Sequence, residues 1–265
     1  ARGRAPRGGD ASSREDALAG LDLLLAEMDA LCSRTRATPA RGATVHAAVV
    51  RFAGACNNGC SACPNRDRWL ADDREALFSR IDAARGADLR PLLFAGREPT
   101  LHPDFLGAVA RARGSDGRRV GVVTNGRRFA YGGFTREATA AGLRAASVKV
   151  FAPTAAVADR VSRDPGGWEQ ARRGVAALRR TGAVAVELRA PLHRENLASF
   201  EHFAALAADW DVDQLRVECA LDAVGLDALT VAARAVRRLA ECCAERDVPM
   251  EALPLASGAL GFDAM

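Results

Sequence analysis

Lysine is almost absent from this chain of 265 residues: Lys149 is the only one, and every other basic residue is arginine. Scarce lysine beside abundant alanine and arginine is typical of GC-rich coding, so a single arginine is a weaker functional signal here than usual. The net charge is only +4 and the arginines are spread along the chain. Nucleic-acid-binding proteins instead concentrate positive charge in a patch or stripe. The composition therefore argues against nucleic acid as a partner.

Long apolar runs are missing as well. No stretch of about 18 apolar residues, the length that crosses a bilayer, occurs in the sequence, and the Arg/Gly-rich residues 1–10 lack the apolar segment of a secretory signal. The seven cysteines are an odd number with three crowded together, unlike the paired framework of small secreted proteins. We therefore expect no membrane partner and a cytoplasmic location.

Apolar residues recur at helical spacing near the N-terminus and then alternate between strand and helix patterns. Leucines predict an amphipathic helix over residues 13–34. Six strands are predicted at 44–52, 91–95, 120–124, 147–151, 184–190 and 214–219. Helices are predicted at 72–84, 103–113, 136–143, 168–180, 196–208 and 226–246. Strands that alternate with helices predict a parallel sheet, because the helix supplies the crossover that parallel neighbours need. Periodicity leaves a doubly wound sheet and an incomplete barrel both open.

Three cysteines, Cys56, Cys60 and Cys63, lie in an eight-residue loop after the first predicted strand. The carboxyl ends of strands are where α/β folds place their chemistry. Thiolates are the usual ligands of iron–sulfur clusters, and three of them on a four-iron cube leave one iron open. The alternative is a non-catalytic metal-binding module or sensor, with zinc completed by His46 or a distant residue.

Four segments in order resemble the radical S-adenosylmethionine (radical SAM) superfamily. The Cys-x3-Cys-x2-Cys spacing matches its defining motif. Residues 96–105, GREPTLHPDF, look like its GGEPT-L-HPDF segment, and residues 124–126 like its TNG turn. Residues 193–197, HREN-L, are similar to a segment of the branch that contains molybdopterin-cofactor, pyrroloquinoline-quinone and peptide-maturation enzymes. The resemblance covers residues 44–219 and implies a partial (β/α)6 TIM-like barrel.

The resemblance also implies the cofactors, one [4Fe–4S] cluster and SAM, and a 5′-deoxyadenosyl radical that modifies a peptide or small-molecule substrate. An electron donor such as flavodoxin or ferredoxin would be a partner. The three cysteines would bind the cluster. The residues implied to bind SAM are Gly96, Glu98, Pro99, Thr100, Asn125, Lys149 and Arg189.

Several of these residues have a plainer interpretation that the sequence leaves open. An ion pair with Glu187, Glu218 or another barrel carboxylate would also explain Lys149 and Arg189, since a buried cation is costly without a partner. For Glu98 the alternative is a salt bridge to a nearby arginine, and for Asn125 simple turn chemistry.

Two positions depart from the family pattern. Arg97 replaces the usual second glycine, and Ala62 replaces the aromatic residue that commonly helps to seat the adenine.

The predicted organisation has four parts. A disordered tail over residues 1–12 precedes the N-terminal helix and linker at 13–43. The radical SAM core barrel spans 44–221, and a C-terminal helix and tail at 222–265 pack on it. The remaining cysteines do not suggest a second cluster, so no auxiliary-cluster domain is expected.

Overall fold

The computed structural model describes residues 10–37, 48–61, 63, 73–87, 91–117, 119–219 and 221–252. Its sheet contains the strands β1 (Ala48–Phe52), β2 (Leu92–Gly96), β3 (Val120–Thr124), β4 (Leu143–Lys149), β5 (Ala185–Leu192), β6 (Gln214–Cys219) and β7 (Met250–Ala252). Each strand pairs in parallel with the next one in the sequence, in the order β1 to β7. In a doubly wound sheet, the order in which successive strands are added would reverse partway across the sheet. The order along the described strands therefore confirms the barrel type of fold, open between β1 and β7.

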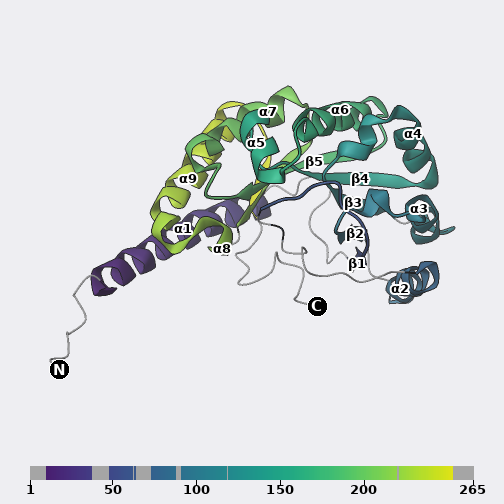
Figure 1. The fold of residues 1–265 in the computed structure, drawn as a ribbon, viewed down its shortest axis with the longest axis horizontal. Helices are drawn as coiled ribbons and strands as arrows, with labels where there is room; N and C mark the ends of the chain where they lie inside the picture. The colour runs from purple at the N-terminus through teal and green to yellow at the C-terminus, as the bar shows by residue number, and fades with distance from the viewer. Residues whose placement is uncertain are drawn as a thin grey trace.

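Helices follow one another along the outside of the curved sheet (Figure 1). The α-helices are α1 (Asp10–Ala37), α2 (Arg74–Gly86), α3 (Phe105–Arg113), α4 (Gly132–Ala141), α5 (Ala155–Ser162), α6 (Gly167–Arg180), α7 (Phe203–Asp209), α8 (Leu221–Val224) and α9 (Leu229–Glu245). Short 3-10 helices are η1 (Pro99–Leu101), η2 (Arg127–Ala130), η3 (Leu197–His202) and η4 (Leu226–Ala228). The long α1 packs against α9 and β7, and its N-terminal turns project from the body in Figure 1. None of the described helices has the length and apolar character to cross a membrane.

The structure corrects three details of the predicted elements. A seventh strand, β7, joins the six that were predicted, although it is only three residues long. β4 begins at Leu143, where a helix was predicted to end, because Gly142 caps α4 in the left-handed region at φ +119°. The alanine-rich start of β4 favours helix by composition, but pairing with β3 and β5 holds it extended. α5 was not predicted at all.

Predictions that concern the first nine residues, the linker at 38–47, Ala62 and residues 253–265 lie outside the described residues. The helix begins at Asp10 rather than residue 13.

Aromatic packing beneath the sheet positions the ends of the first two strands. The Phe52 ring, at the end of β1, lies 4.9 Å from the Phe94 ring of β2 and 5.5 Å, edge to face, from the His102 ring. Phe105, at the start of α3, contacts Phe52 and Phe94 from the helix layer. Phe52 and Phe94 are almost fully buried, so this cluster anchors the loops that leave β1 and β2.

Candidate metal centre and cofactor site

The three cysteines of the loop after β1, the cysteine loop (Cys56–Cys63), share one electrostatic environment. Burial, with smaller contributions from the sulfurs of Cys56 and Cys63, raises the pKa of Cys60 to about 12. Burial is also the main cause of the raised pKa of Cys56; the Asn58 backbone N–H opposes it, and Glu98 and Cys63 add to it. The Asn58 N–H donates to Cys56 Sγ at 3.5 Å. The sulfurs of Cys56 and Cys63 thus act on Cys60, and Glu98, in the loop after β2, acts on Cys56.

Such an environment suits a cationic centre. Metals and iron–sulfur clusters are bound by the thiolate, which burial disfavours unless positive charge is close by. Among the described residues, no three His, Cys, Asp or Glu side chains are grouped so as to hold a metal ion. A structural zinc site closes with four ligands, whereas a four-iron cube with three protein ligands keeps one iron open. The donor set, three thiols in one loop, fits a cube with an open corner.

The cysteine loop is docked against the end of α5. The Gly59 backbone N–H donates to Ser162 O at 2.8 Å, and the Ser61 N–H donates to Val161 O at 3.0 Å. These carbonyls belong to the last turn of a helix, where intrahelical partners run out. The loop therefore completes the hydrogen bonding of α5 while α5 holds the loop.

The loop after β2 begins at Gly96, a position that only glycine can occupy. Gly96 has φ +131°, and a Cβ there would lie 2.1 Å from Phe52 O. The absence of a side chain allows β2 to approach the end of β1 as the cysteine loop departs. The Arg97 backbone N–H then donates to the same Phe52 carbonyl at 3.4 Å. Pro99 starts the short η1 helix.

Glu98 is buried, with a relative exposure of 2%, and its carboxylate ties two loops together. Oε1 accepts from the Thr100 N–H at 3.2 Å, from Thr100 Oγ1 at 2.6 Å and from Thr124 Oγ1 at 2.7 Å. Oε2 accepts from the Asn125 N–H at 2.7 Å. Burial raises the pKa of Glu98, although the hydrogen bonds from Asn125, Thr100 and Thr124 oppose it. These partners are backbone N–H groups and hydroxyls, not the arginine of the salt-bridge alternative.

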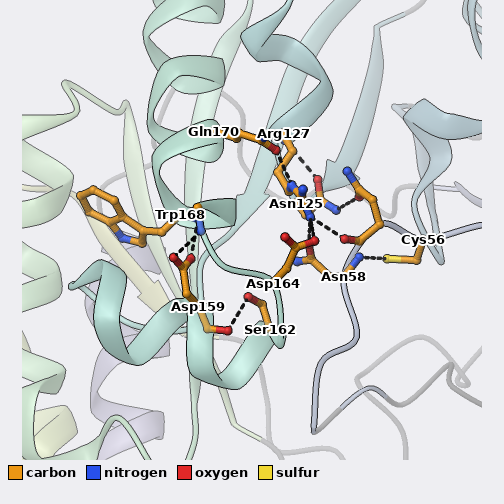
Figure 2. Close-up of polar contacts among 11 residues, drawn as sticks. Cys56, Asn58, Asn125, Arg127, Asp159, Ser162, Asp164, Trp168 and Gln170 are labelled. Atoms are coloured by element: carbon orange, nitrogen blue, oxygen red, sulfur yellow. Dashed lines mark hydrogen bonds and ion pairs between the residues drawn. The ribbon is translucent and has the colours of Figure 1, made fainter.

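Asn125 connects the loops that follow β1, β2 and β3. Its Nδ2 donates to Asn57 Oδ1 of the cysteine loop at 2.6 Å, while its backbone N–H bonds Glu98. Its Oδ1 accepts from the Arg127 N–H at 3.1 Å. Figure 2 shows Asn125 at the centre of these contacts, beside Arg127 and Asn58. The structure thus brings together the cysteine loop, Glu98 and Asn125.

Lys149 and Arg189 belong to a charge network on β4 to β6, and Lys149 directly follows Val148, which pairs with Thr124 at the end of β3. Lys149 Nζ is 2.7 Å from Glu218 Oε2, and Arg189 Nη1 is 2.6 Å from Glu218 Oε1. Arg189 Nε also lies 3.1 Å from Glu187 Oε1. Burial raises the pKa of Glu218, but Lys149 and Arg189 outweigh it and hold that pKa at about 2. The ion-pair alternative for both cations is therefore present in the structure.

Sequence reasoning missed one residue that contacts the cysteine loop. Arg127 is buried and contacts Asn57 and Asn58. Its position directly after the TNG turn was an available signal, but the abundance of arginine obscured it.

A parallel α/β barrel with soft-metal ligands and polar loops at the carboxyl ends of its strands defines the class of this protein. The family model that matches it is the radical SAM superfamily, over residues 50–207. Because the match covers more than half of the chain, the chain belongs to the radical SAM superfamily of enzymes. No curated protein matches the sequence significantly.

Solved structures show the same fold at low sequence identity. Streptococcus suis SuiB bound to the precursor peptide SuiA has a TM-score of 0.60 and 11% identity, covering 78% of this chain and 48% of SuiB. Methylornithine synthase PylB has a TM-score of 0.56 and 10% identity, covering 98% of this chain and 81% of PylB. A radical SAM methyltransferase from Sphaerobacter thermophilus has a TM-score of 0.51 and 17% identity, covering 79% of this chain and 65% of the methyltransferase. The chain spans about half the length of SuiB.

Proposed function

We propose that this chain binds one [4Fe–4S] cluster through Cys56, Cys60 and Cys63 and binds SAM beside it. The observation that carries the proposal is the hydrogen-bonded path from the cysteine loop to the other two loops, through Asn57, Asn125 and Glu98. This path links three motifs that are far apart in the sequence. They are the cysteine loop, the GREPT segment and the TNG turn, which follow β1, β2 and β3. Together with the family match, this path supports a shared site for cluster and SAM.

The loop after β2 supplies the contacts proposed for the methionyl part of SAM. Gly96 lets the end of β2 pack closely against Phe52 of β1, and Pro99 and Thr100 form the short helix that follows Glu98. Glu98 Oε2 accepts one hydrogen bond, from Asn125, so it retains a lone pair for the SAM amino group. Glu98 thus has two proposed tasks, to hold the loops and to accept that bond.

For the SAM carboxylate, Lys149 is a better candidate than Arg189. The Lys149 side chain is 18% exposed, whereas that of Arg189 is 6% exposed and engaged by two carboxylates. An ammonium has three donors, so Lys149 can keep Glu218 and still bind a second anion. Arg189 is proposed to hold Glu218 in place.

Held by these residues, a reduced cluster and SAM would supply the radical chemistry that removes hydrogen from the substrate. The protein's part is to position the cofactors and exclude water. A peptide substrate is supported by the fold likeness to SuiB, whose structure contains its precursor peptide, and a small molecule is the other class proposed. A flavodoxin or ferredoxin is proposed as electron donor, with residues 44–221 as the catalytic core.

A pair of matched cysteine variants tests the cluster. Cys60 and Cys243 are both buried, and burial is the main cause that raises the pKa of each thiol to about 12. Cys243 lies on α9, outside the cysteine loop. After anaerobic reconstitution, Cys60→Ala should lose most of its iron and sulfide, and Cys243→Ala should retain them. The reduced wild type should form 5′-deoxyadenosine from SAM.

Two results would contradict the proposal. One is a normal iron and sulfide content in Cys60→Ala. The other is a colourless wild type that binds zinc in place of iron, which would indicate the non-catalytic metal-binding module.

A further inference from the structure

Arg127 joins four parts of the chain through one side chain. Its Nε donates to Gln170 Oε1 of α6 at 2.8 Å, and its Nη1 contacts Asn58 Oδ1 at 2.7 Å. The same Nη1 contacts the Asn57 carbonyl oxygen and the Asp164 carboxylate. Figure 2 shows Asn58 and Asp164 beside the end of the Arg127 side chain. The side chain is 10% exposed, so these contacts are largely shielded from water.

The partners of Arg127 are themselves held in place. The Asp164 backbone N–H donates to Asp159 O at 3.1 Å. The Asp159 carboxylate accepts from the Gly166 N–H at 2.6 Å and from the Trp168 N–H at 2.8 Å. Asp159 therefore fixes the connection between α5 and α6, and that connection presents Asp164 to Arg127.

The backbone that carries Arg127 is fixed by close packing. A Cβ added at Gly174 of α6 would lie 2.1 Å from Gly126 O, so α6 rests directly on the TNG turn. Gly126 has φ +78°, in the left-handed region. The Arg127 N–H also donates to Asn125 Oδ1. Contacts within the protein thus fix both the backbone and the side chain of Arg127.

We propose that Arg127 is a positioning residue that fixes the cysteine loop in the geometry required for the cluster. It holds Asn57 and Asn58, which lie between the first two cysteine ligands, against the frame made by α5 and α6. A planar guanidinium suits this task because its donors point in several fixed directions, whereas a lysine offers a single point of charge. The proposal rests on the proposed function for its consequence but not for the contacts themselves.

The test uses Arg127→Gln and, as matched control, Arg172→Gln. Arg172 is an exposed arginine of α6 that pairs within its helix with Glu169. In the full chain before reconstitution, hydrogen–deuterium exchange should accelerate about tenfold at the cysteine-loop amides of Gly59 and Ser61, as expected for losing a hydrogen bond to a charged group. After reconstitution, loss of iron to a chelator should accelerate about tenfold. The control should match the wild type in both measurements.

Arg127→Lys should give rates between those of Arg127→Gln and the wild type in both measurements. Lysine keeps the positive charge but lacks the several fixed donors of the guanidinium. If Arg127→Gln does not fold, Asp164→Asn, which removes only the counter-charge, should give a smaller acceleration at the same amides. Unchanged exchange in the loop would overturn the proposal, as would an acceleration spread evenly over the whole chain. A wild type that takes up no iron would instead refute the cluster assignment, since the exchange measurement needs no cluster.

Discussion

Replacing Glu98 by glutamine keeps the size of the side chain and exchanges one carboxylate oxygen for an NH2 group. The carboxylate serves two backbone donors on different oxygens, the Thr100 N–H on Oε1 and the Asn125 N–H on Oε2. Glutamine keeps one oxygen and turns the other into an NH2 group, so in either orientation one backbone N–H faces a donor. The hydroxyls of Thr100 and Thr124 can rotate to new acceptors, but a backbone N–H cannot. A buried donor left unsatisfied costs about 1–3 kcal/mol.

We therefore expect Glu98→Gln to lower the free energy of unfolding by about 1–3 kcal/mol in urea denaturation. Because Asn125 also bonds Asn57, a displaced Asn125 should slow the formation of 5′-deoxyadenosine more than the loss of stability explains. The control is Glu169→Gln, an exposed carboxylate paired within its helix with Arg172, where the cost should stay below about 0.5 kcal/mol. Equal stability and equal SAM cleavage in Glu98→Gln and wild type would refute this account of Glu98.

Two further changes probe the frame of the site. The pKa of Glu218 is held at about 2, below the usual 4.5, so its contribution to stability is present above pH 4.5 and is lost as the pH falls toward 2. Glu218→Gln should therefore flatten the acid limb of a stability–pH curve. At pH 7 it should cost about 3–5 kcal/mol by leaving Lys149 without its counter-charge; an unchanged acid limb would contradict the ion-pair assignment. Gly174→Ala should lower stability by about 1–3 kcal/mol in thermal or urea unfolding, since its Cβ would meet Gly126 O. Gly133→Ala, with open space around the new methyl group, is its control, and equal stability of the two variants would argue against close packing of α6 on the turn.

The Glu98 geometry also changes what an alanine replacement would report. If Glu98 only bound SAM, as the resemblance implies, Glu98→Ala would leave the cluster intact and weaken SAM cleavage. In the structure the carboxylate holds Asn125, and Asn125 holds Asn57 of the cysteine loop. Removing the Glu98 carboxylate would therefore also disturb the cysteine loop, which carries the proposed cluster ligands. Glutamine is the sharper test because it preserves the size of the side chain.

Elements with a strong local pattern were predictable. β3, β6 and α6 follow from apolar runs and helical periodicity, and the parallel arrangement follows from the alternation of strands and helices. Where the local signal was weak, the prediction failed. The three-residue β7 is defined by its pairing with β6, and α5 is a helix of eight residues between two loops. The start of β4 was wrong because alanine favours helix until neighbouring strands impose an extended backbone.

By itself the sequence determined the order of the motifs, the strand after which each one lies and the set of three thiols. These are local properties, since each depends on residues close together in the chain. Only the tertiary structure decided which side chains meet: Glu218 with Lys149, Asn125 with Asn57, and Arg127 with a carbonyl 70 residues away. Such contacts exist because parallel pairing brings the carboxyl ends of distant strands to one edge of the sheet. Among so many arginines, burial and geometry alone distinguish the one that holds the cysteine loop.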